Sequence, residues 1–158
     1  MKHLFSIRIA TLSDMHELKE LYQNTVLTVN RKDYSTAEIE DWASCGDDIA
    51  HLQKSFTEQY YIVAENQRQY IVGFASINDE GYMHTLFVHK DFQHQGVATL
   101  LYQYLEVYAQ EKGIEKITSE VSITAKPFFE KQGFLVDEEQ RRKANRLCLI
   151  NYKMSKSI

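Results

Sequence analysis

The sequence has few of the residues that divide a chain into separate parts. Its 158 residues include one proline, Pro127, and six glycines, with no Gly/Ser-rich linker, low-complexity tract or internal repeat. This length is typical of one domain with a substantial hydrophobic core. We therefore expect a single domain over residues 1–158.

Cysteines and long apolar segments are equally scarce. Cys45 and Cys148 form no CxxC pair and no metal-ligand spacing, as is typical of reduced thiols in a cytosolic protein. No apolar run approaches the ~20 residues that a membrane-spanning helix needs. The first residues, MKHLFSIRIATLSD, lack the apolar core and cleavage site of a signal peptide. We expect a cytoplasmic protein with no membrane partner.

A large excess of charge is also missing. Lys and Arg number 18, Asp and Glu number 22, and the formal net charge is −4. A mildly acidic chain has no general field that attracts nucleic acid or anionic membranes, so no nucleic-acid partner is expected. The charge would suit a cationic small molecule but is too small to identify one.

Apolar spacing predicts both strands and helices along the chain. Strands are expected at residues 5–10, 59–65, 70–78, 82–89, 116–121, 134–137 and 147–154. Helices are expected at 15–22, from a capping box at Ser35 and Glu38 through Trp42, at 47–56, from Val97 to a stop at Lys112-Gly113, and near 125–132. This order predicts a mixed α/β or α+β sheet with a central strand-turn-helix unit.

The stretch FQHQGVATLL, residues 92–101, joins an expected strand to an expected helix. The first turn of a helix offers free N–H groups and partial positive charge, which suit a phosphate that the backbone can approach closely. Gly96 and Ala98 reduce side-chain bulk there. A tight turn without a ligand would use the same glycine. The chain lacks GxxxxGK[ST] and GxGxxG, which excludes a P-loop and the usual dinucleotide site.

Two motifs together resemble the GCN5-related N-acetyltransferases, the GNAT family. Residues 93–98 (QHQGVA) match the family signature Q/R-x-x-G-x-G/A. Residues 125–134 (AKPFFEKQGF) resemble its second hallmark, A-x-x-F-Y-x-x-x-G-F, and 147–156 resemble its usual last strand. The resemblance covers most of residues 5–154 and includes the order of elements.

The resemblance implies a mostly antiparallel, mixed sheet of about seven strands, flanked by helices, whose fourth and fifth strands splay apart around acetyl-CoA. The pantetheine arm would pair with Leu86–Val88, and the pyrophosphate would sit over His94–Thr99. The residues expected to bind this cosubstrate are Leu86, Phe87, Val88, Gln93, His94, Gln95, Gly96, Val97, Ala98, Thr99, Ser122, Phe128 and Phe129.

The family's proton-transfer residues are only partly present. The tyrosine that often protonates the leaving thiolate is replaced by Phe129, and a frequent asparagine by Ser122. No acid occupies the usual base position near residue 82. Strand alternation predicts that Tyr82, His84, Leu86 and Val88 share one face. His84 is the preferred base because its ordinary pKa suits neutral pH, and Tyr82 and Glu120 are further candidates. His84 and Glu120 could equally be solvated residues without a catalytic role.

The acceptor is less well defined than the cofactor. The segment between the first helices carries Tyr34, Trp42 and the acids Glu38, Glu40, Asp41, Asp47 and Asp48. Tyr34 and Trp42 are predicted to bind an acceptor, whose amine the acids would attract. Alternatively, Trp42 is a core residue and the acids form the wet face of its helix. His84, His89 and His94 recur every five residues but point to different faces, so no metal is expected.

Three functions are compatible with the sequence. The first is N-acetyl transfer from acetyl-CoA to a primary amine of a small molecule or protein, by a monomer or homodimer. The second is a catalytically weak GNAT-fold module that binds or senses CoA, which Phe129 and the missing acid favour. The third is an unrelated mixed domain without a cofactor.

Overall fold

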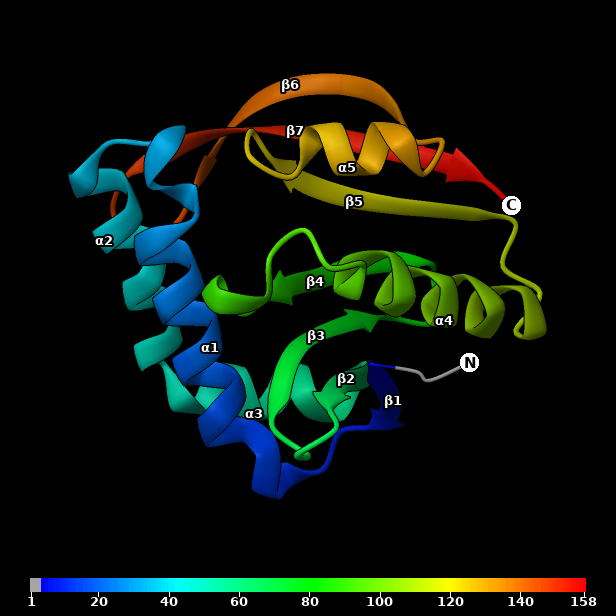
Figure 1. Cartoon of the computed structure of the whole chain (residues 1–158). Helices are drawn as coiled ribbons and strands as arrows, with labels where there is room; N and C mark the ends of the chain where they lie inside the picture. The colour runs from blue at the N-terminus through cyan, green and yellow to red at the C-terminus, as the bar shows by residue number, and fades with distance from the viewer. Residues whose placement is uncertain (1–3) are drawn as a thin grey trace.

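The computed structural model describes residues 4–158, and the order of its elements is the one expected from the sequence (Figure 1). Seven strands form the sheet: β1 (Phe5–Ile9), β2 (Tyr60–Asn66), β3 (Ile71–Ile77), β4 (Tyr82–Val88), β5 (Lys116–Ser122), β6 (Leu135–Lys143) and β7 (Cys148–Ser157). The α-helices are α1 (Met15–Thr28), α2 (Thr36–Ser44), α3 (Ile49–Glu58), α4 (Val97–Glu111) and α5 (Lys126–Lys131). The last two strands extend further than their predicted limits.

The strands are ordered β1-β2-β3-β4-β5-β7-β6, and every neighbouring pair is antiparallel except β4 and β5. Within residues 4–158, those two parallel strands pair only at Tyr82↔Thr118 and Met83↔Ser119. Beyond this point they separate toward their carboxyl ends. The expected splayed pair in a mixed, mostly antiparallel sheet is therefore confirmed.

Helices cover both faces of the sheet (Figure 1). The apolar stripe of α4 buries Val97, Leu101 and Leu105 in the main core, at the i, i+4, i+8 spacing of one helix face. Each such side chain contributes about 1.5–3 kcal/mol when fully buried. Two smaller cores lie on the other face, where α1 and α2 pack, and they contain Leu18 and Ile39.

The predicted helix ends are confirmed where the sequence carries a specific capping or termination signal. Ser35 Oγ accepts from the Glu38 N–H at 3.1 Å, and Glu38 Oε1 accepts from the Ser35 N–H at 2.9 Å, so the capping box is confirmed. α4 stops at Lys112, and Gly113 follows with φ of 74°. A left-handed residue just after a helix is the usual place for glycine.

The predicted alternation along β4 is wrong. Ser76 of β3 is opposite Thr85, but Ile77 is opposite Met83, so His84 is an extra residue in a β-bulge. The bulge puts Met83 on the same face as Leu86 and Val88, in the main core beneath α4. His84 does not share that face.

No helix between residues 4 and 158 combines the length and the apolar character that crossing a membrane would require.

Candidate active site

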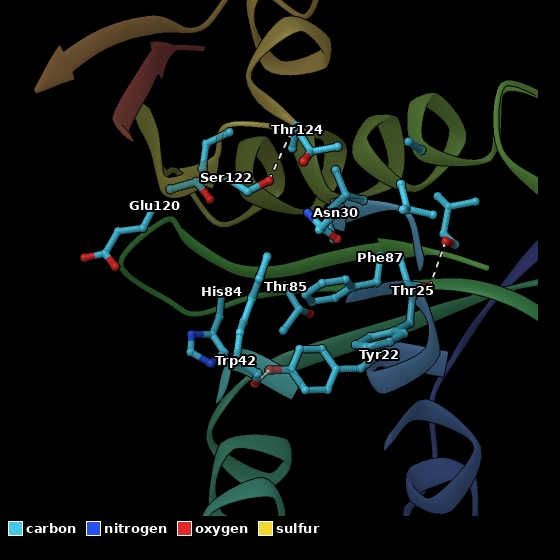
Figure 2. Close-up of a pocket in the computed structure, with 18 of the residues that line it drawn as sticks. Tyr22, Thr25, Asn30, Trp42, His84, Thr85, Phe87, Glu120, Ser122 and Thr124 are labelled. Atoms are coloured by element: carbon cyan, nitrogen blue, oxygen red, sulfur yellow. Dashed lines mark hydrogen bonds between the residues drawn. The ribbon is translucent and has the colours of Figure 1, made fainter. Parts of the chain in front are cut away.

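One large groove, with a volume of about 760 Å³, runs between the splayed strands and under α1 and α2. This size lies within the usual range for sites that bind small molecules. Figure 2 shows side chains from both halves of the sheet facing it. It brings together the predicted residues Tyr34, Trp42, Tyr82, His84, Leu86, Phe87, Val88, Gln93, His94, Val97, Ala98, Thr99, Glu120, Ser122, Phe128 and Phe129. Gln95 and Gly96 belong to the same loop but are not among its lining residues.

The start of α4 forms one end of the groove. The helical ladder begins with the Leu100 N–H to Gly96 C=O bond of 3.0 Å, so the amides of the preceding Val97–Thr99 turn have no acceptor within the helix. Gly96 has φ of 84°, and an added Cβ would meet nothing within 4 Å. His94, with φ of 59°, is also left-handed, a conformation that non-glycine residues rarely adopt. This end therefore combines free donors, an open approach and a constrained backbone, which fits a phosphate.

The end of β4 is fixed by side chains that contact its last carbonyl. Thr25 Oγ1 and Gln93 Nε2 donate to Val88 C=O at 3.1 and 2.7 Å. The His89 N–H bonds to β3 at Val72, so by alternation the peptide groups of Leu86 and Val88 point toward the splay. Apart from the occupied Val88 carbonyl, this strand edge is open to the groove, as the resemblance implies for pantetheine. Thr25 was not predicted, because nothing in a helical threonine signals a partner 63 residues away.

His84 is the most accessible titratable side chain on this stretch of β4. Its surroundings in the groove remove hydration, and this lowers the pKa of the imidazole below 6.5. The charge of nearby His51 acts in the same direction, and Glu120 opposes it. No hydrogen bond or ion pair to another residue in 4–158 holds the ring. A neutral, unbonded imidazole in a groove can accept a proton.

The other two base candidates have different surroundings. Burial, and secondly the charge of Glu120, raise the pKa of Tyr82 to about 12, so its hydroxyl remains protonated at neutral pH. The Glu120 carboxylate lies 3.3 Å from Arg142 Nε. This ion pair engages the carboxylate, whereas the His84 ring has no such partner among residues 4–158. Arg142, on β6, was not identified from the sequence.

Phe129 is a core residue as well as part of the groove wall. Its side chain is 3% exposed and packs edge-to-face against Phe128 and Phe134. Ser122 Oγ accepts from the Ala125 N–H at 3.1 Å, which leaves its own proton available as a donor. Ser122 therefore presents a donor hydroxyl to the groove from the end of β5.

Of the predicted acceptor residues, Trp42 lies on α2 and Tyr34 just before it, and both line the groove. The Tyr34 hydroxyl donates to Ile150 C=O at 2.6 Å and accepts from the Ile123 N–H at 2.9 Å. It therefore links β5 and β7 and has no free polar atom for a ligand. The Trp42 ring makes an edge-to-face contact with Tyr34 and a tilted contact with Phe87, with ring centroids 5.8 and 6.3 Å apart. The two residues supply an aromatic wall, and their role in acceptor binding stays a prediction.

Asp41 has a role that the sequence did not indicate. Its side chain is 2% exposed and accepts hydrogen bonds from the N–H groups of Asn145, Arg146 and Leu147 at 2.9–3.1 Å. It fixes the turn between β6 and β7 against α2. Residues 4–158 contain no cluster of three or more His, Cys, Asp or Glu side chains that could hold a metal ion.

Comparisons with known proteins identify the family of this chain. Residues 30–156 match the family model described as an acetyltransferase (GNAT) domain. The chain is 30% identical to the uncharacterised N-acetyltransferase YafP of Escherichia coli over 141 residues, 89% of this chain and 88% of the relative. The chain belongs to the GNAT acetyltransferase family.

Solved GNAT structures have the same fold. A GCN5-related N-acetyltransferase from Rhodopseudomonas palustris superposes with a TM-score of 0.95 at 27% identity, over 100% of this chain and 98% of that one. PaiA N-acetyltransferase from Thermoplasma acidophilum, solved in complex with coenzyme A, gives a TM-score of 0.79 at 18% identity over the full length of both chains. The protein is thus a GNAT acetyltransferase, and the third hypothesis, an unrelated domain, is wrong.

Proposed function

We propose that this acetyltransferase transfers an acetyl group from acetyl-CoA to a primary amine, with the cosubstrate lying between β4 and β5. The supporting observation is that the open Gly96 loop, with its unpaired amides, and the unpaired His84 imidazole face one continuous groove. When bound there, acetyl-CoA would supply an activated thioester. The amides of Val97–Thr99 would hold its phosphates, and the free edge of β4 would align its arm.

His84 would prepare the acceptor. A protonated amine has no free electron pair, so it must lose a proton before it can attack a carbonyl carbon. Partial loss of hydration in the groove lowers the His84 pKa although the side chain stays accessible, so the imidazole is largely neutral at pH 7 and can take this proton, directly or through a water. The β-bulge is what turns His84 away from the core beneath α4 and into the groove.

Ser122 would act at the leaving thiolate. Its oxygen is occupied by the Ala125 N–H, so its hydroxyl hydrogen is free to bond to a sulfur in the groove. A hydrogen bond to an ionised group contributes about 1.5–3 kcal/mol, which would partly replace the missing tyrosine at Phe129.

The test is release of CoA from acetyl-CoA in the presence of primary amines, followed by identification of the acetylated product by mass spectrometry. Turnover with at least one amine, abolished or strongly reduced in His84→Ala, supports the proposal. Turnover that is unchanged in His84→Ala contradicts the assignment of the base.

A CoA-binding module without turnover is the second candidate. It is favoured by Phe129, which has no proton to donate and is buried as a packing residue. Tight CoA binding together with no acetyl loss to any amine, even at pH 9 where a larger share of each amine is deprotonated than at pH 7, would favour this function over transfer.

A further inference from the structure

The acids expected to attract an amine all lie outside the groove. Of the five predicted acids, Glu40 is exposed, Glu38 and Asp48 cap α2 and α3, and Asp41 holds the β6–β7 turn. Asp47 lies 3.0 Å from Gln23 Nε2 and 3.6 Å from Lys19 Nζ. None of these side chains lines the groove. Attraction of a purely cationic acceptor by this segment therefore has no structural support.

The wall opposite the aromatic residues carries positive charge instead. Glu120 is the one acid among the groove's described lining residues, and Arg142 neutralises it at 3.3 Å. Lys143, next along β6, also lines the groove and has no acidic partner among residues 4–158. With two cations against one acid, this part of the groove is net cationic. Glu120 raises the pKa of His84, so the acid that contacts Arg142 also lies within electrostatic reach of the imidazole.

Arg142 is presented to the groove with free donors. Its contact with Glu120 is made through Nε, so the two terminal NH₂ groups remain unpaired within residues 4–158. A guanidinium with two free terminal nitrogens can bind a carboxylate in a fork. The β6–β7 turn just beyond Arg142 is clamped by Asp41, which limits movement of this wall.

We propose that the preferred acceptor is a small amine that carries a carboxylate, which Arg142 binds while the amine faces His84. Glu120 is then a positioning residue that orients Arg142, and the rings of Tyr22, Trp42 and Phe87, which contact one another in the groove, pack the apolar body of the acceptor. The inference rests on the proposed acetyl transfer and adds the class of acceptor.

The test uses pairs of amines that differ by one carboxylate: L-phenylalanine with 2-phenylethylamine, and L-leucine with 3-methylbutylamine. We expect kcat/KM to be about tenfold higher for the carboxylate member, because a charged hydrogen bond at a partly exposed site has this order of effect. Arg142→Gln should abolish the preference, and Arg142→Lys should retain part of it. Arg141→Gln, one residue earlier on the opposite face of β6, is the matched control and should retain it fully.

A carboxylate also lowers the pKa of a neighbouring amine, so dependence on Arg142 is the deciding comparison. Glu120→Gln should raise KM for L-phenylalanine more than it lowers kcat, as expected of a positioning residue but not of a base. Equal kcat/KM for both members of each pair, or equal effects of Arg142→Gln and Arg141→Gln, would overturn the inference while leaving acetyl transfer intact.

A second measurement separates this inference from the proposed function. Binding of N-acetyl-L-phenylalanine and N-acetyl-2-phenylethylamine to the CoA-loaded protein can be measured by calorimetry without turnover. Tighter binding of the carboxylate product, lost in Arg142→Gln, supports the carboxylate site even if no amine is acetylated. Equal affinity for both products overturns it.

Discussion

At the residue scale, the bulge at His84 connects backbone geometry to chemistry. One extra residue in β4 moves an imidazole out of the face that packs under α4 and into the groove. The sequence identified His84 as a candidate because of its side chain. It could not place the bulge, because no glycine or proline marks it and the apolar pattern around it reads as regular alternation.

The first prediction concerns the pH dependence of this residue. The neutral imidazole is the active form, so activity should fall as pH decreases through the His84 pKa. Partial loss of hydration in the groove, followed by the charge of His51, lowers that pKa, so the fall of kcat/KM at acidic pH should have its midpoint below 6.5. His84→Ala should remove this fall and reduce the rate about 10²–10⁴-fold.

His51→Gln is the matched control for this profile. It removes a neighbouring charge that opposes protonation of His84, so the midpoint should move upward with little loss of maximal rate. If the midpoint of the acidic fall in kcat/KM is the same in both variants as in the unmodified protein, the titration belongs to another group.

The second prediction separates two effects of the glycine at the start of α4: on the stability of the fold and on CoA binding. Gly96 and Gly113 flank α4, both have positive φ, and at both an added Cβ meets nothing within 4 Å. Alanine at either position should therefore cost about 1–2 kcal/mol of stability from the left-handed conformation alone. Only Gly96→Ala places a methyl group where the phosphates would lie, so only this variant should weaken CoA binding.

Thermal unfolding and CoA titration by calorimetry measure the two quantities. We expect the two variants to lose a similar amount of stability. Only Gly96→Ala should also bind CoA tenfold or more weakly. Equal CoA affinities in the two variants would move the phosphates away from this loop.

At the element scale, the turn between β6 and β7 depends on a carboxylate in α2. Asp41→Asn keeps the shape of the side chain but removes the charge that accepts three backbone N–H groups. We expect lower stability at neutral pH, and acceptor kcat/KM reduced by about tenfold to a hundredfold, because the wall that carries Arg142 is no longer held in place. CoA affinity should change little.

The same contact predicts a pH effect on stability. Hydrogen bonds from Leu147 and its neighbours lower the pKa of Asp41 below its ordinary 3.8. A lowered folded-state pKa contributes stability that is present above pH 3.8 and is lost as pH falls through the folded value. Asp41→Asn should lack this component of the acid-unfolding curve, and the exposed Glu40→Gln should retain it. An unchanged curve in Asp41→Asn would exclude the carboxylate as the anchor.

The sequence was most informative where an element carries its own local signal. The Ser35–Glu38 capping box, the stop at Gly113 and the apolar stripe of α4 were all predicted and are confirmed, because each depends on residues within a few positions. The anchor at Asp41 depends on partners about a hundred residues further along the chain. No single-sequence pattern encodes such pairs.

At the scale of the whole molecule, the sheet consists of two halves that are weakly joined. β4 and β5 pair at two positions, and Ser119 Oγ donates to Met83 C=O at 2.9 Å beside them. Tyr34 provides a second link, from the segment before α2 to the backbone of Ile123 and Ile150. Between these links lies the groove, so a ligand along β4 would contact both halves.

The last prediction follows from this arrangement. CoA at a hundred times its dissociation constant should add about 2.7 kcal/mol of stability, and so raise the melting temperature of a chain of this size by about 5–11 °C. Hydrogen exchange should slow at the Leu86 and Val88 amides, which face the splay, as well as at the start of α4. Adenosine 3′,5′-bisphosphate carries phosphates but no pantetheine arm, so it should protect the start of α4 and leave both β4 amides unchanged. Equal protection of Leu86 and Val88 by the two ligands would show that the arm does not lie along β4.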